Sequence, residues 1–206
     1  MKVLLINGSP KGKGSTFSAL SEVCKIFIKN AIEWEILSVG REPIRDCIGC
    51  GKCRELKKCA FNDVVNEIAE KAQGFDGFVF GTPVYYAHPT GSILALLDRL
   101  FYANSINFRH KPAAAIAVAR RAGAVASIDV INKYFTISEM PIVSARYWNG
   151  VYGRDSDDVP KDDEGMENMR ILGENMTWML KCIDLGKRNN ILPPVNNKEK
   201  WTHFIR

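Results

Sequence analysis

The stretch Lys2-Val-Leu-Leu-Ile-Asn7-Gly8-Ser-Pro-Lys-Gly-Lys-Gly-Ser15-Thr16, near the start of the chain, decides the fold. Residues 2–7 form a short apolar run that ends at a turn, which is typical of a buried parallel strand. The glycine-rich turn opens onto a segment whose apolar residues recur at helical spacing: Phe17, Leu20, Val23, Cys24, Phe27 and Ala31. A strand, a glycine-rich turn and a helix in this order predict the first unit of an α/β sheet.

The rest of the chain repeats this alternation of strand and helix. The patterns predict further strands at 34–39, 75–81, 113–119 and 141–145, and helices at 63–73, 90–102, 125–135 and 164–185. Such alternation predicts a five-stranded parallel sheet with helices on both faces, a three-layer α/β sandwich with the flavodoxin-like strand order 2-1-3-4-5. We expect one domain over residues 1–206, with a cysteine-rich loop at about 40–62 and a C-terminal tail at about 187–206.

Composition narrows the class of protein. The chain is 46% hydrophobic and 25% charged, with a net charge of +5. It has no apolar run near the ~18 residues of a membrane span and no signal peptide, so we expect a cytoplasmic protein without a membrane partner. The basic residues near the cysteines lack the interleaved aromatic residues of a nucleic-acid surface, so no nucleic-acid partner is expected. Cys24 and Cys182 lie alone in apolar helical patterns and are predicted to be buried.

The turn after the first strand is predicted to bind a phosphate. Backbone N–H groups and the positive end of the helix dipole favour an anion there, and serine and threonine hydroxyls add donors. The spacing of the glycines and Lys13 excludes both a Walker loop and a dinucleotide fingerprint. The predicted cofactor-binding residues of this turn are Ser9, Lys11, Ser15, Thr16 and Phe17.

Two further loops should meet this turn, because ligands of an open parallel sheet bind beyond the carboxyl ends of its strands. The loop at 82–88 offers a stiff, aromatic surface for a flat ring, and the loop at 120–124 follows the fourth strand. A phosphate pocket beside such a surface predicts FMN. The predicted cofactor-binding residues are Pro83, Val84, Tyr85, Tyr86, Arg120, Arg121 and Gly123. As alternatives, the two tyrosines could be half-buried core residues and the two arginines surface residues, whereas His88 is expected at the surface.

Four of the six cysteines, Cys47, Cys50, Cys53 and Cys59, are spaced C-x2-C-x2-C-x5-C. With glycines between them, the backbone can curl so that their sulfurs converge, which suits a metal or an iron–sulfur cluster. Structural zinc and free or disulfide-forming thiols remain alternatives. The loop leaves the same edge of the sheet as the flavin loops, so a cluster there is expected within reach of the flavin for electron transfer.

Several motifs together resemble the NAD(P)H-dependent FMN reductase family, and the cysteine loop resembles its iron–sulfur flavoprotein branch. The motifs are Asn7-Gly-Ser-Pro10 before the glycine-rich turn, Gly81-Thr-Pro-Val-Tyr-Tyr86 before a helix, and Leu97-Asp-Arg99 inside it. The resemblance implies an FMN-dependent oxidoreductase that forms a homodimer or homotetramer, with all four cysteines holding one [4Fe-4S] cluster. The single glycine in Ala119-Arg-Arg-Ala-Gly-Ala124 departs from the glycine-rich third loop of many relatives.

The predicted activity is electron transfer from NAD(P)H or a reduced carrier, such as a ferredoxin-like protein, through FMN to a quinone, an oxygen species or another small acceptor. The flavin supplies the chemistry at its N5 atom, so no catalytic side chain is predicted. The basic residues around the cysteines suggest a docking surface for a small acidic electron carrier. The alternatives are a non-catalytic electron-transfer protein, or an FMN reductase whose cysteine loop holds structural zinc or free thiols.

Overall fold

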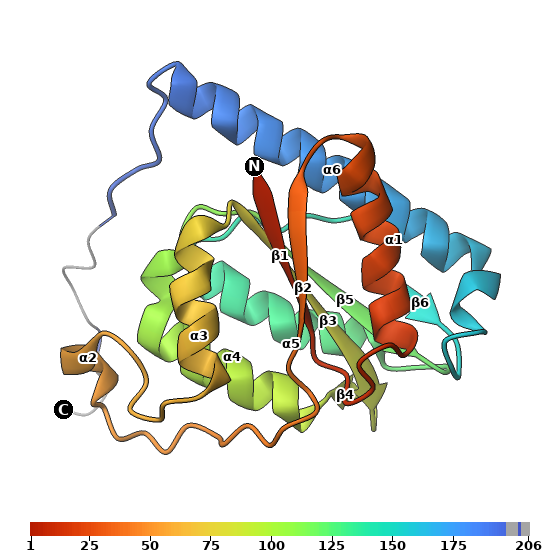
Figure 1. The fold of residues 1–206 in the computed structure, drawn as a ribbon, viewed down its shortest axis with the longest axis horizontal. Coiled ribbons are helices and arrows are strands. Elements are labelled where there is room, and N and C mark those ends of the chain that lie inside the picture. Colours follow the sequence, from red (N-terminus) through yellow and green to blue (C-terminus); the bar gives the residue numbers. More distant parts are fainter. Residues whose placement is uncertain (197–201, 203–206) are drawn as a thin grey trace.

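The computed structural model describes residues 1–196 and 202, and Figure 1 shows their arrangement. The strands are β1 (Lys2–Asn7), β2 (Glu33–Ser38), β3 (Gly77–Tyr85), β4 (His88–Pro89), β5 (Ala113–Ala119) and β6 (Gly150–Tyr152). The α-helices are α1 (Ser15–Lys29), α2 (Cys53–Leu56), α3 (Val64–Lys71), α4 (Gly91–Asn104), α5 (Ala124–Ile137) and α6 (Asp163–Arg188).

The main sheet has the strand order β2-β1-β3-β5-β6, and all of these neighbours are parallel. The short strand β4 pairs with β3 in the antiparallel sense and extends that strand as a hairpin. Counted in chain order without β4, this is the predicted order 2-1-3-4-5. The flavodoxin-like three-layer prediction is therefore confirmed.

Strand β1 supplies both hydrophobic cores because its side chains alternate between the two faces of the sheet. Leu4 and Ile6 point into the core beneath α3, α4 and α5, whereas Val3 and Leu5 point into the core beneath α1 and α6. All four side chains are fully buried. Figure 1 shows these helices on the two sides of the sheet.

The fifth strand lies later in the chain than the sequence predicted. Residues 141–145 form one bridge, between Ile142 and Ala113, whereas the edge strand proper is β6 at 150–152. The chain leaves the sheet between these two contacts, and the buried side chain of Asn149 fills the gap. Its Nδ2 donates to the carbonyl of Ala115 at 3.1 Å, and its Oδ1 accepts from the Ala145 N–H at 3.0 Å. A side chain therefore replaces ladder hydrogen bonds that a continuous strand would have made.

Most helix predictions are confirmed to within a few residues. Asp63 and Thr90 cap α3 and α4 through hydrogen bonds that their side chains accept from Val65 and Ile93. Cys24 is buried, as predicted, but Cys182 is exposed on α6, so that prediction was wrong. Helix α6 continues into the predicted tail as far as Arg188, and the tail residues 197–201 and 203–206 lie outside the described residues.

Among the described residues, no helix combines the length and the apolarity that crossing a membrane requires. The long helix α6 packs against α1, and Gly173 of α6 lets the two backbones come close together. A Cβ atom added at Gly173 would lie 2.8 Å from the Cβ of Ile26, and 3.1 and 3.2 Å from the two γ carbons of Ile26. The neighbouring atoms belong to the stiff base of a β-branched side chain, which cannot swing away.

We predict that Gly173→Ala lowers the free energy of unfolding by about 1–3 kcal/mol, because the added methyl group overpacks the α1–α6 contact. Gly91→Ala is the matched control, since a Cβ there meets nothing within 4 Å. It should be neutral or stabilising by up to about 1 kcal/mol. Urea unfolding of both variants measures the difference, and equal stabilities would contradict the packing account.

Candidate functional site

The turn after β1 is organised by the buried side chain of Asn7. Its Nδ2 donates to the carbonyl of Gly12 at 3.2 Å and to the hydroxyl of Ser38 at 3.1 Å, and its Oδ1 accepts from the N–H of Ser9 at 3.1 Å. The Ser9 hydroxyl in turn accepts from the N–H of Lys11 at 3.2 Å. Side chains at the start of the turn thus hold it in shape, and the end of the turn leads directly into α1. The sequence showed Asn7 only as part of a motif.

The beginning of α1 suits an anion. Its N-cap is Gly14, which has no side chain to pair with the first N–H groups of the helix. The Thr16 hydroxyl is buried, and within the described part of the chain it has no hydrogen-bond partner. Lys11 and Lys13 are exposed beside the turn. A phosphate group of FMN would satisfy both the free N–H groups and this hydroxyl, so the residues present fit that group.

The second predicted loop is tied directly to the first. Thr90 donates from its hydroxyl to the carbonyl of Gly8 at 3.2 Å, and its own N–H donates to the hydroxyl of Thr82 at 3.1 Å. Between these threonines, the β3–β4 hairpin turns at Tyr86 and Ala87, which have positive φ values of 51° and 60°. The hairpin therefore stands at the carboxyl edge of the sheet beside the phosphate turn.

The side chains of this hairpin are open to ligands. Pro83 and Val84 are half-buried, whereas Tyr85 is 50% exposed and Tyr86 fully exposed. The alternative of half-buried core residues was therefore wrong for Tyr86, whereas Tyr85, with half of its surface exposed, belongs to neither hydrophobic core. His88 is exposed, as expected.

The third loop packs against the hairpin at Gly123. This residue has φ of 90°, and a Cβ there would lie 2.4 Å from the Cα of Ala87 and 2.8 Å from Val84. Glycine is thus required both by the backbone conformation and by the close approach. Arg120 and Arg121 are exposed on the same loop. The structure therefore brings the three predicted flavin loops together, while the contact of each named residue with FMN stays a prediction.

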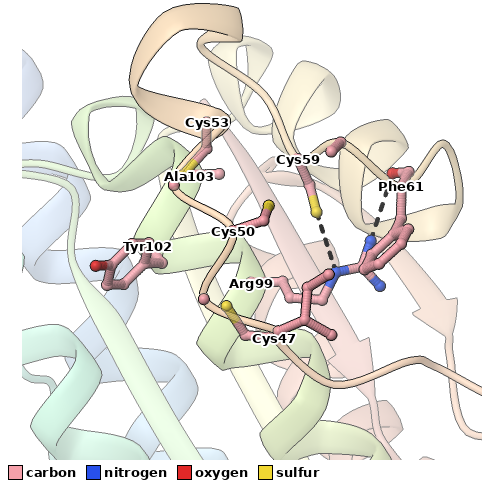
Figure 2. A pocket seen from close by; sticks show the side chains of 12 residues that line it. Cys47, Cys50, Cys53, Cys59, Phe61, Arg99, Tyr102 and Ala103 are labelled. Carbon is pink, nitrogen blue, oxygen red and sulfur yellow. Dashed lines mark hydrogen bonds between the residues drawn. The ribbon is translucent and has the colours of Figure 1, made fainter.

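The four clustered cysteines line one pocket, shown in Figure 2. Its empty space, which includes some open solvent, is about 370 Å³. Gly49 and Gly51, with φ of 64° and 69°, curl the backbone between the cysteines, and Cys53 begins the short helix α2. The other lining residues come from the loop itself and from α4: Ile48, Gly49, Gly51, Ala60, Phe61, Arg99, Tyr102 and Ala103.

The four thiols line the pocket without forming a ready-made site for a metal ion. In the described residues, no three His, Cys, Asp or Glu side chains are gathered closely enough to hold a single metal ion. Structural zinc and an iron–sulfur cluster both need several cysteine ligands around one compact centre, so the kind of centre that this loop holds stays a prediction.

Arg99 of α4 is the buried cation of this pocket. Its Nε–H donates to the sulfur of Cys59 at 3.2 Å, and its terminal nitrogens donate to the two carboxylate oxygens of Asp63 at 2.7 and 2.8 Å. Burial alone would lower the pKa of Arg99, but the hydrogen bonds to Asp63 and Cys59 together outweigh it and raise the pKa above its usual value. The sequence contained a signal for this residue, since an arginine between Leu96, Leu97, Leu100 and Phe101 must find polar partners.

The backbone at the last cysteine is held by a second buried side chain. Asn66 of α3 accepts from the N–H of Cys59 at 2.9 Å, and its Nδ2 donates to the carbonyls of Cys59 and Phe61, both at 3.0 Å. Cys59 is therefore fixed through its backbone by Asn66 and through its sulfur by Arg99.

The cysteine pocket lies along α4 from the flavin loops, and its expected reach to the flavin for electron transfer stays a prediction. The loop does leave the carboxyl edge of the sheet after β2, but it then runs beside α4. Helix α4 begins at Gly91 near the hairpin, and Arg99 lies about 12 Å farther along its axis at 1.5 Å per residue. Figure 1 shows α2 and β4 well apart. The two sites are therefore separate, and α4 connects them.

Comparison with known proteins places the chain. Residues 1–154 match the family model described as NADPH-dependent FMN reductase. The chain is 32% identical to an iron–sulfur flavoprotein of Methanocaldococcus jannaschii over 191 residues, which is 89% of this chain and 99% of that protein. The fold of this chain is similar to that of FerB, a flavoenzyme NAD(P)H:(acceptor) oxidoreductase from Paracoccus denitrificans, with 15% identity and a TM-score of 0.64. The match covers 88% of this chain and 97% of FerB. An archaeal flavodoxin also shares the fold, with 12% identity, a TM-score of 0.59 and coverage of 88% and 99%.

A shared fold alone would not give a family match over residues 1–154 together with 32% identity across nearly the whole length of both proteins. The chain therefore belongs to the NADPH-dependent FMN reductase family of oxidoreductases, among the relatives named iron–sulfur flavoproteins.

Proposed function

We propose that this oxidoreductase binds FMN at the three loops of the carboxyl edge and holds a [4Fe-4S] cluster with Cys47, Cys50, Cys53 and Cys59. It passes electrons from NAD(P)H or a reduced carrier to a small acceptor such as a quinone or an oxygen species. The observation that carries this proposal is that the four cysteines line one pocket in a chain of an FMN reductase family.

The roles of the residues at the flavin site follow from their geometry. Free N–H groups at the start of α1 and the Thr16 hydroxyl bind the phosphate, and the hairpin at Pro83–Tyr86 orients the ring. The packing of Gly123 against the hairpin keeps the third loop close to the same place. Bound FMN supplies hydride acceptance from a nicotinamide and single-electron exchange with a metal centre. The protein therefore needs to bind and orient rather than to exchange protons.

The surface beside the cysteines supports docking of an acidic electron carrier. Around α2, the exposed basic residues are Lys52, Arg54, Lys57 and Lys58, with Glu55 as the acidic exception. Complementary charge on a carrier would speed its encounter with this surface. A ferredoxin-like protein of net negative charge is therefore the donor that we propose alongside NAD(P)H.

We predict that Thr16→Val weakens FMN binding about tenfold or more, because the lost hydroxyl would hydrogen-bond a charged phosphate. The stability of the flavin-free protein should stay the same or rise, since this hydroxyl has no partner among the described residues. Ser21→Ala is the control, because Ser21 lies more than one helical turn beyond Thr16 and its hydroxyl already donates to the backbone carbonyl of Phe17. Fluorescence titration of each flavin-free protein with FMN measures the dissociation constants of the wild type and the two variants. Equal FMN affinities for wild type and Thr16→Val would exclude this phosphate position.

We predict about four iron and four sulfide ions per chain, together with one FMN, in protein purified without oxygen. Cys50→Ser should lose most of the iron and sulfide while keeping FMN, because Cys50 lines the pocket and the flavin loops lie elsewhere. Cys182→Ser, an exposed cysteine outside the loop, should keep both centres. Metal, sulfide and flavin analysis of one preparation decides this. Zinc without sulfide in the wild type would favour the structural alternative.

We predict that reversing Lys57 and Lys58 to glutamate slows reduction of the flavin by a reduced ferredoxin of net negative charge, and weakens its dependence on salt. Reversal of the exposed residues Lys29 and Lys133, which lie outside the loop, is the charge-matched control. Stopped-flow absorbance at two ionic strengths measures the rates. If both double variants react alike, the surface around α2 is not the docking site.

A further inference from the structure

Arg99 contacts a predicted cluster ligand while being almost completely buried. The residue is 2% exposed, and its Nε–H points at the sulfur of Cys59 at 3.2 Å (Figure 2). A guanidinium so deep in the protein needs a fixed counter-charge, and Asp63 supplies it through two parallel hydrogen bonds. The carboxylate thereby fixes the orientation of the guanidinium, and the remaining Nε–H is left for the sulfur.

The same side chain pins both ends of the cysteine segment. It donates to the carbonyl of Arg45, two residues before Cys47, at 3.1 Å. It also contacts Phe61 and Asp63, which follow Cys59, through the Phe61 carbonyl at 3.4 Å and the carboxylate. Between these ends Cys47 and Cys50 are exposed, and a Cβ added at Gly49 or Gly51 would meet nothing within 4 Å. Because the middle of the segment is exposed, its position depends on where its ends are held.

The hydrogen bond to Cys59 has an electrostatic consequence for any cluster in this pocket. A cationic donor stabilises negative charge on the ligand sulfur, and the reduced state of a cluster carries one electron more than the oxidised state. Hydrogen bonds to ligand sulfurs are among the features that set cluster reduction potentials. The donor should therefore favour the reduced state.

We propose that Arg99 is a positioning residue of the cysteine site, which pins both ends of the loop and raises the reduction potential of the cluster through its hydrogen bond to Cys59. The inference rests on the proposed function, because a potential can shift only if a cluster is bound. The pinning of the loop is independent of the cluster and can be measured without it.

The matched control for charge is Arg45. Its guanidinium lies 5.0 Å from the ring of Phe61, and that of Arg99 lies 5.1 Å from the same ring, but the Arg45 side chain is exposed. Arg99 bonds only the backbone carbonyl of Arg45, which every substitution keeps. Arg45→Gln therefore removes one positive charge from the same neighbourhood and leaves the hydrogen bond to Cys59 in place.

The test compares wild type, Arg99→Gln, Arg99→Lys and Arg45→Gln, each loaded with iron and sulfide without oxygen. We expect Arg99→Gln to shift the one-electron equilibrium toward the oxidised state by about tenfold, equivalent to a midpoint potential about 59 mV lower. Arg99→Lys keeps the charge but not the planar guanidinium, so its midpoint potential should lie between those of wild type and Arg99→Gln. Arg45→Gln should stay close to wild type. An EPR-monitored redox titration measures all four.

A second readout uses the cluster-free proteins. Hydrogen–deuterium exchange of residues 44–63 should rise in Arg99→Gln and stay unchanged in Arg45→Gln. Because Arg99→Gln leaves Asp63 without its partner, it could fail to fold. Arg99→Lys then carries the test of the potential, and Asp63→Asn, which keeps Arg99 but weakens its orientation, carries the exchange test, each with a smaller effect in the direction expected for Arg99→Gln.

The outcomes separate the two claims. A wild type that takes up no iron and sulfide overturns the proposed cluster and the claim about its potential, while exchange in the cluster-free proteins still decides the pinning. A loaded wild type whose potential equals that of the Arg99 variants, or an equal shift in Arg45→Gln, overturns the inference alone. Faster exchange without a change in potential would leave Arg99 a purely structural residue and also contradict the proposal.

Discussion

Parallel pairing of β1 between β2 and β3 is the constraint from which both candidate sites follow. In a parallel sheet each connection must cross back over a face, so every strand delivers its following loop to the same edge. The order β2-β1-β3 makes the turn after β1 and the hairpin after β3 immediate neighbours, and β5 adds the third loop beside them. The loop after β2 starts from this edge as well, and its length allows it to travel to a second location.

Helix α4 joins the two locations. Its cap residue Thr90 binds the carbonyl of Gly8 at the start of the phosphate turn. About two and a half turns farther on, Arg99 reaches from the same helix into the cysteine pocket. One rigid element thus carries a residue that shapes each site. The two sites can therefore be fixed relative to each other without sharing a lining residue.

The elements that could be predicted from the sequence are those set by local pattern. The apolar run of β1, the caps Asp63 and Thr90, and the meeting of the three loops all depend on residues close in the chain or on the order of the elements. The edge strand was misplaced because residues 141–145 have strand character, while the side chain of Asn149 interrupts the pairing. Cys182 was misassigned because an apolar helical pattern does not tell which residues of an outer helix face the solvent. The position of the cysteine pocket could not be predicted, because it depends on hydrogen bonds between Arg99 and residues 36 to 54 positions away in the chain.

Our proposal that one chain holds two redox centres can be checked by counting electrons in an anaerobic reductive titration of protein isolated without oxygen. FMN accepts two electrons and a [4Fe-4S] cluster accepts one. We expect consumption of about three electron equivalents per chain, with bleaching of the flavin absorbance and the appearance of an EPR signal from a reduced cluster. Consumption of two equivalents, with full flavin reduction and no cluster signal, would contradict it.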